Sequence, residues 1–215
     1  MYTVDINILL KEESVINKHI SEYQNYVNKT GNRLNLYRLI ANEFNIKVAL
    51  YPGSHIDLDP SLVIPKVTYI DNFKGAIKFF KNIDEINLFL ENNKEYFSRC
   101  EFNFIGEDYS KTLDIDKVDL IISQYAGFVG QATKRYLRSN GILLCNDSHG
   151  DATLAKFDSD FKFIGVIENN RIKSTKLDEY FKLPKGKKIN LDIVRTKMKG
   201  FKYIKRAENY IFRKI

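Results

Sequence analysis

The sequence of 215 residues lacks long apolar segments and contains only two cysteines. No apolar run approaches the roughly 18 residues that cross a bilayer, so neither a transmembrane helix nor a membrane partner is expected. The N-terminus, MYTVDINILLKEES, has no basic segment and no small-residue cleavage site, which argues against a signal peptide. Cys100 and Cys145 are far apart and have no metal-ligand spacing, so we expect buried, reduced thiols in a cytoplasmic protein.

Several catalytic motifs are also missing. The sequence contains no GK[ST] phosphate loop, no serine elbow and no cysteine in a nucleophilic context, which argues against P-loop enzymes and against serine and cysteine hydrolases. His55 and His149 have aspartates nearby but no metal-ligand spacing, so no metal site is expected. His19 is predicted to lie on a helix face.

The charge of this otherwise ordinary composition is unevenly distributed. Hydrophobic residues make up 44% and charged residues 28%, which suits a globular α/β domain. The net charge is +7, with 16 Lys and Arg against five Asp and Glu from Lys162 onward, and 18 against 22 before it. A basic flank beside an acidic body predicts an anionic partner, with nucleic acid as one candidate, whereas lysine-rich codon usage is the alternative explanation.

Short apolar runs alternate with amphipathic segments through most of the chain. Two N-terminal helices are expected over residues 11–27 and 34–45, where they would cover a sheet or the mouth of a site. Strands are then expected at residues 48–51, 67–70, 102–105, 118–123 and 142–145, with helices at 73–82, 83–97 and 128–137 between them. This alternation predicts a parallel, doubly wound α/β sheet, because parallel neighbours need long crossover connections.

The alternation stops after Ala155. Residues 161–167, 203–204 and 210–212 are strand-like but have no helices of βαβ type between them. The pattern therefore favours a mixed sheet with antiparallel strands at the C-terminus. We expect one domain over residues 1–215, divided into an N-terminal helical cap (1–45) and a Rossmann-like core (46–215).

The segment from Lys47 to Asp71 predicts a nucleoside site. Its first apolar run is broken by the turn Pro52-Gly53-Ser54, and its second run ends at Asp71, 18 positions after Gly53. In dinucleotide-binding folds an acid about 20 residues beyond the glycine loop binds a ribose hydroxyl. The alternative is that Asp71 caps the helix that begins near Phe73.

These features resemble the class I S-adenosylmethionine-dependent methyltransferases over residues 46–214. Gly53, Asp71, Asp108 and the segment DLIISQY (119–125) carry the resemblance. Two longer segments resemble an uncharacterised group of bacterial proteins for which this fold is expected. They are YPGSHIDLDPSLVIPKVTYID and DLIISQYAGF…YLRSNGILLCNDSHGD. The resemblance implies a Rossmann-like, doubly wound, mixed seven-stranded sheet with helices on both faces and an antiparallel C-terminal strand pair. Residues 210–212 would lie antiparallel beside the fifth strand.

The resemblance also implies S-adenosylmethionine as the cofactor and a role for each matching residue. Gly53 would let the methionine part approach the backbone, Asp71 would bind the ribose, and Asp108 would face the adenine amino group beside the ring of Tyr109. Asp108 could equally belong to a simple turn, with Glu107 as its substitute. The implied cofactor-binding residues are Tyr51, Gly53, Ser54, Asp57, Asp71, Asn72, Asp108, Tyr109, Ser123 and Gln124.

The glycine loop departs from the pattern of that family. Tyr51 replaces the usual acid, and His55 and Asp57 occupy places of later glycines, where side chains would crowd a ligand that needs close backbone approach. We expect a wider loop, with a pocket at the ends of the first and second strands and His55 at its rim. Asp57 could bind the amino group of the cofactor in place of the lost acid.

His149 and Tyr125 are the candidate catalytic residues. His149 follows the fifth strand and could take a proton from the acceptor, or it could be a loop histidine bonded to Asp147 or Asp151. Tyr125 could form the floor of the transfer site or belong to the core. An Asn-Pro-Pro-aromatic segment is absent, which argues against DNA adenine as the acceptor.

Two functions remain open at the level of the sequence. The first is methyl transfer to an oxygen or nitrogen nucleophile, most simply on a small molecule. The second is a non-catalytic binding module that docks an anionic or nucleic-acid partner through residues 162–214.

Overall fold

The computed structural model describes residues 20–215 of the chain. Residues 20–30 form a helix, and α2 spans Leu34–Glu43, as expected. The beginning of the helix expected from residue 11, together with His19, lies outside the described residues. No helix within residues 20–215 is long and apolar enough to cross a membrane.

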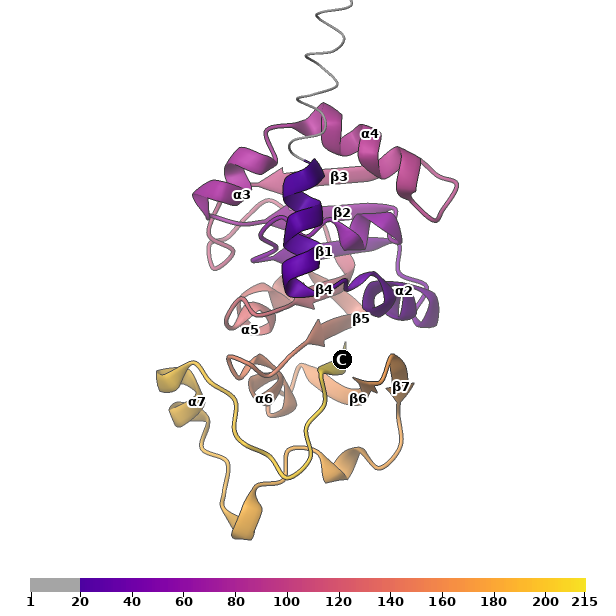
Figure 1. Ribbon diagram of the computed structural model, residues 1–215. Helices are drawn as coiled ribbons and strands as arrows, with labels where there is room; N and C mark the ends of the chain where they lie inside the picture. The colour runs from indigo at the N-terminus through magenta and orange to yellow at the C-terminus, as the bar shows by residue number, and fades with distance from the viewer. Residues whose placement is uncertain (1–19) are drawn as a thin grey trace, which may run out of the picture.

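An eight-stranded mixed sheet forms the centre of the protein, with the strand order β3-β2-β1-β4-β5-β8-β6-β7 (Figure 1). Its strands are β1 (Val48–Pro52), β2 (Lys66–Ile70), β3 (Glu101–Ile105), β4 (Val118–Ser123), β5 (Leu137–Cys145), β6 (Phe161–Glu168), β7 (Arg171–Lys173) and β8 (Asn209–Lys214). The first five strands run parallel. The expected doubly wound α/β architecture is therefore confirmed.

Helices lie in the connections between strands and cover both faces of the sheet (Figure 1). They are α3 (Lys74–Phe79), α4 (Ile83–Asn93), α5 (Val129–Thr133), α6 (Asp151–Lys156) and α7 (Leu191–Lys197), with short 3-10 turns at Asp59–Leu62, Lys134–Tyr136, Leu177–Glu179 and Pro184–Gly186. Successive β1 residues alternate between two cores, since Ala49 and Tyr51 join one cluster and Leu50 joins the other. This alternation explains why the strands read as nearly continuous apolar runs.

The C-terminal strand lies between β5 and β6 and is antiparallel to both. Leu144 of β5 pairs with Ile211 of β8, which confirms the expected antiparallel insertion beside the fifth strand. The expectation of a strand at residues 203–204 is wrong. The hydroxyl of Tyr203 instead shares a hydrogen bond of 2.7 Å with Thr153 in α6, so this tyrosine anchors a loop.

The sheet has eight strands rather than the expected seven because β6 and β7 form a hairpin. Asn169 and Asn170 make its two-residue turn, with φ of 51° and 55°. Asparagine tolerates this left-handed conformation, which the favoured hairpin turns require. The eighth strand was missed because its sequence, Arg171-Ile172-Lys173, is short and largely polar.

The strand order creates a switch point between β1 and β4. From β1 the chain proceeds to β2 and β3 on one side, and from β4 to β5 on the other. Open α/β sheets bind ligands in the crevice beyond the carboxyl ends of strands at such a point. The loops after β1 and β4 are therefore the place to look for a site.

Candidate functional site

Two cavities open at the carboxyl ends of the parallel strands. The first, called here the switch-point cavity, has a volume of about 440 Å³ and is lined by Tyr26, Thr30, Arg33, Tyr51, Gly53, His55, Gln124 and Tyr125. The second, called the β5 cavity, has a volume of about 590 Å³ and is lined by Tyr125, by residues after β5 and by residues between 199 and 210. Both volumes lie within the range of roughly 300–1,000 Å³ that is usual for small-molecule sites.

Tyr125 lines both cavities. It follows β4 with a φ of 58°, a left-handed conformation that costs a residue with a side chain roughly 1–2 kcal/mol. Its side chain is 62% exposed, so the alternative of a core tyrosine is wrong. The guanidinium carbon of Arg33 lies 5.5 Å from the centre of its ring. Its left-handed backbone and its place between two cavities make Tyr125 a candidate site residue.

The loop after β1 packs tightly against the loop after β4. Gly53 has a φ of 65° and donates its N–H to the carbonyl oxygen of Ile70 at 2.7 Å. A Cβ on Gly53 would lie 2.2 Å from the Cβ of Ala126. The glycine is therefore required by contact with the protein itself. Ser54, the next residue, is buried.

The ring of His55 is sandwiched between two aromatic rings at the edge of the switch-point cavity. Its centroid lies 5.0 Å from that of Tyr26 and 5.4 Å from that of Phe73, and both pairs are stacked. Within the described chain, Nδ1 of His55 is buried and has no hydrogen-bond partner. His55 lines this cavity as expected, but the cavity lies between β1 and β4 rather than between β1 and β2.

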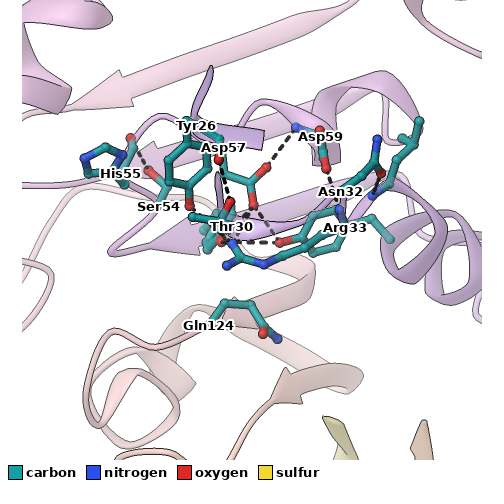
Figure 2. Close-up of polar contacts among 12 residues, drawn as sticks. Tyr26, Thr30, Asn32, Arg33, Ser54, His55, Asp57, Asp59 and Gln124 are labelled. Carbon is teal, nitrogen blue, oxygen red and sulfur yellow. Dashed lines mark hydrogen bonds and ion pairs between the residues drawn. The ribbon is translucent and has the colours of Figure 1, made fainter. Parts of the chain in front are cut away.

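A buried polar network joins the loop after β1 to the start of α2 (Figure 2). One Asp57 oxygen accepts hydrogen bonds from Arg33 at 3.1 Å, Tyr37 at 3.0 Å and Tyr51 at 3.1 Å. The other oxygen accepts the backbone N–H of Asp59 at 3.1 Å. Burial and the Asp59 carboxylate raise the pKa of Asp57 to about 6 despite the ion pair with Arg33. Asp57 thus stabilises the protein interior and does not line the cavity.

Arg33 is a candidate site residue that the sequence did not single out. Its backbone N–H donates to Asp59 at 2.8 Å, which fixes the start of α2 over the loop after β1. Its side chain lines the switch-point cavity, and Figure 2 shows Asp57 and Gln124 on opposite sides of the guanidinium group in that view. A cation directly after the helix-breaking Thr30-Gly31-Asn32 turn was the available signal.

Asp71 makes both of its observed hydrogen bonds to backbone N–H groups. Its oxygens accept from His55 at 2.7 Å and from Phe73, the residue before α3, at 2.8 Å. Asp71 is not the N-cap of α3, because Phe73 occupies that position and no side chain caps the helix; the carboxylate instead fixes the turn before α3 and the loop after β1. Each carboxylate oxygen retains a further lone pair that could accept a ribose hydroxyl. The neighbouring Asn72 is exposed.

The residues after β3 form a turn that reaches the loop after β4. Asp108 accepts the backbone N–H of Ser110 at 2.8 Å, as the turn alternative requires, and hydrogen bonds from Ser110 hold its pKa below the usual value. Glu107 pairs with Lys111 at 2.7 Å. The Tyr109 hydroxyl donates to the carbonyl oxygen of Ala126, so Tyr109 bridges the two loops.

The last residues of β4 are held by buried hydrogen bonds. Ser123 donates to Asp151 at 2.6 Å, and Asp151 also accepts the N–H of Gly130 at the start of α5. Burial raises the pKa of Asp151 to about 6. Gln124 donates to Asn209 at 2.7 Å and accepts from Asn146 at 3.1 Å, which links β4, β8 and the loop after β5. Of these two residues, Gln124, which directly follows β4, lines the switch-point cavity.

Asp147, rather than His149, lines the β5 cavity. His149 lies 3.1 Å from the hydroxyl of Ser148 and hydrogen-bonds neither Asp147 nor Asp151. Asp147 accepts the backbone N–H and hydroxyl of Thr153 at 2.7 and 2.9 Å. Burial raises its pKa to about 6, so the carboxyl is mostly ionised near neutral pH and able to take a proton. Its position directly after a strand was the available signal.

The described residues contain no cluster of histidine, cysteine and acidic side chains that could hold a metal ion. Cys100 and Cys145 are both buried and free, as expected.

Comparison with known proteins shows similarity through structure. No protein-family model matches the sequence, and no curated protein matches it. TehB from Haemophilus influenzae is a structural neighbour, with a TM-score of 0.52 and 15% identity over 90% of this chain and 67% of its own. This chain has the Rossmann-like methyltransferase fold.

Further neighbours carry methyltransferase names. A methyltransferase from Geobacter sulfurreducens has a TM-score of 0.47 and 13% identity over 76% of this chain and 92% of its own. The N-methyltransferase NodS from Bradyrhizobium japonicum, in complex with S-adenosyl-L-homocysteine, has a TM-score of 0.40 and 15% identity over 61% and 74%. At these identities the likeness concerns the fold, and similarity to the narrower bacterial group stays a prediction.

Proposed function

We propose that this protein is an S-adenosylmethionine-dependent methyltransferase that acts on an oxygen or nitrogen nucleophile of a small molecule. The observation that carries the proposal is the position of Tyr125, which separates a cavity at the switch point from a second cavity beyond β5. A two-substrate transfer needs two adjoining sites whose contents meet in a fixed alignment. In this arrangement the switch-point cavity takes the donor and the β5 cavity takes the acceptor.

The residues of the switch-point cavity fit such a donor. His55 lines this space of about 440 Å³, and its buried Nδ1 has no hydrogen-bond partner among the described residues, whereas a buried polar group normally has one. Arg33 provides a cation for a carboxylate, and Gln124 lines the cavity directly after β4. Asp71 is not part of the lining, but it holds the backbone N–H of the lining residue His55 and retains acceptor capacity for a ribose.

The cofactor, when bound, supplies an electrophilic methyl group on a positively charged sulfur. Arg33 and Gln124 would hold its methionine part, and Asp71 and His55 would hold its nucleoside part. Tyr125 would orient the acceptor at the boundary of the two cavities, while Asp147 accepts the proton that the nucleophile loses. Catalysis would thus depend mainly on alignment, with a carboxylate as general base. His149 stays a weaker candidate for that base.

A non-catalytic binding module is the second candidate, and specific contacts favour it. Ala126 fills the space beside Gly53, and the carboxylate of Asp57 is occupied by Arg33 and two tyrosines. A glycine and an acid that would serve the ligand in an active relative are here used by the protein itself.

Calorimetric titration of the full chain with S-adenosylmethionine and S-adenosylhomocysteine tests the proposal. We expect saturable binding of both, weakened about tenfold or more in His55→Phe, which keeps the aromatic stack but removes Nδ1. His149→Phe is the matched control, because His149 lines neither cavity, and its affinity should stay at the wild-type value. Absence of heat for both ligands in the wild type would favour the binding module.

A further inference from the structure

Three cationic side chains line the β5 cavity without a partner in the part of the chain that the structure describes. Lys199, Lys202 and Arg206 all contribute to its lining, and none forms a hydrogen bond or ion pair with any residue in the described range 20–215. Lys205, between them in sequence, is instead satisfied by Glu179 at 2.7 Å and lies 4.7 Å from the centre of the Tyr180 ring. Of the four cations between residues 199 and 206, the three without a described partner are those that line the cavity.

The segment that carries these cations is fixed against the loop after β5. A Cβ on Gly200 would lie 2.1 Å from a carboxylate oxygen of Asp147, so the backbone touches this acid. The hydrogen bond between Tyr203 and Thr153 and the bond from Ile204 N–H to Lys182 at 2.9 Å secure the same segment. The cations thus occupy a defined wall of the cavity rather than a free tail.

The charge and shape of the cavity favour an anionic small molecule. Its lining includes three cations against two acids, Asp147 and Glu208, and Asp147 is already bonded to Thr153. Tyr125, Phe201 and Tyr210 add aromatic surface to the same lining. Basic side chains that bind nucleic acid usually form a stripe or a broad face, whereas these converge on one concavity.

We propose that the methyl acceptor is a small molecule with a phosphate or carboxylate group, bound in the β5 cavity by Lys199, Lys202 and Arg206. An aromatic or apolar body would lie against Tyr125 and Phe201, which places its nucleophile toward the switch-point cavity. This assignment rests on the proposed function for the direction of transfer. The anion site itself can be tested without the methyl donor.

The test uses phenyl phosphate, benzoate and neutral benzyl alcohol as probes of the full chain, in calorimetry and thermal unfolding without S-adenosylmethionine. We expect saturable binding of at least one of the two anions. The anion that binds more tightly shows whether the natural substrate carries a phosphate or a carboxylate. Benzyl alcohol should bind at least tenfold more weakly.

Two charge-matched triple variants locate the site. Lys199→Gln/Lys202→Gln/Arg206→Gln should weaken anion binding at least tenfold. Its unfolding temperature without ligand should stay close to wild type, because the three side chains have no partner among residues 20–215. Lys185→Gln/Lys187→Gln/Lys188→Gln removes the same charge from exposed positions outside both cavities and should change affinity less than twofold.

Three results would overturn the inference. They are absence of binding for both anions, equal weakening by the two triple variants, and displacement of the bound anion by a single-stranded RNA that binds more tightly. Binding of S-adenosylmethionine without anion binding would remove this inference alone. Anion binding without S-adenosylmethionine binding would instead remove the proposed function and leave the anion site.

Discussion

Gly53 and Ala126 are in contact where the loops after β1 and β4 meet, and a Cβ on Gly53 would lie 2.2 Å from that of Ala126. Real Cβ atoms do not approach so closely, so one of the two positions must lack a side chain or the loops must separate. The contact closes part of the crevice between these loops. It explains why residue 53 is a glycine although the following positions 55 and 57 carry the side chains of His55 and Asp57.

We expect Gly53→Ala to lower the free energy of unfolding by about 2–4 kcal/mol, because overpacking and the positive φ both oppose an added Cβ. Adding Ala126→Gly should restore the packing part and leave about 1–2 kcal/mol of backbone strain. Chemical denaturation of both single variants and the double variant measures this coupling. Strictly additive effects would show that the two positions do not interact.

The left-handed backbone at Tyr125 should appear as a difference in stability between two variants that both lose activity. Because its φ is 58°, Tyr125→Gly should be about 1 kcal/mol more stable than Tyr125→Ala, although both lose the ring and its contact with Arg33. Both variants should lose most methyl transfer while keeping affinity for S-adenosylmethionine within a fewfold. Equal denaturation midpoints for the two variants would mean that the loop relaxes to a negative φ.

Asp71→Ala should weaken both ligand binding and folding. Loss of hydrogen bonds to a charged group predicts a decrease of about 1.5–3 kcal/mol in the binding free energy of S-adenosylmethionine. The freed N–H groups of His55 and Phe73 predict a further loss of about 1–2 kcal/mol in unfolding free energy. Asp71→Asn keeps one acceptor oxygen and should be intermediate in both measurements. Unchanged calorimetry for Asp71→Ala would reduce Asp71 to a residue that only positions the loop.

Asp151 should make the protein less stable as pH rises from about 4 to about 6. Burial raises its pKa from 3.8 to about 6, so in this window the folded protein keeps a proton that the unfolded chain has released. The shift corresponds to a decrease of about 3 kcal/mol in the free energy of unfolding between low and neutral pH. Asp151→Asn should abolish this decrease. Denaturant titrations at pH 4, 5, 6 and 7 measure the difference.

Asp158 provides a control of opposite sign. Burial raises its pKa, but hydrogen bonds from Lys134, Asp160 and Gln131 outweigh burial and hold the pKa below 3.8. Asp158 therefore contributes stability that is present above pH 4 and is lost as pH falls. Asp158→Asn should make the protein less stable at pH 7, whereas Asp151→Asn should not. The same pH profile for both variants would contradict the two opposite shifts.

The sequence by itself determined the order and direction of most elements. Apolar runs of strand length between amphipathic helices specify parallel crossovers. The loss of that rhythm after Ala155 indicated an antiparallel strand at residues 210–212, which the structure extends to 209–214. These signals are local, because alternation, helical spacing and turn residues act over a few positions. The sequence did not predict the hairpin strand Arg171–Lys173, because three largely polar residues are too few to show an alternation of apolar and polar positions.

Only the tertiary structure decided which side chains meet at the site. Arg33 reaches Asp57 across 24 positions, and Gln124 bonds Asn209 across 85, distances over which no sequence periodicity operates. The hydrogen bond from the backbone N–H of His55 to Asp71 likewise depends on the folded position of the loop after β1. The C-terminal segment packs on the loop after β5, and this packing pairs Lys205 but leaves Lys199, Lys202 and Arg206 without a described partner. The sequence cannot show this difference, because burial and the distance to a partner are properties of the folded chain.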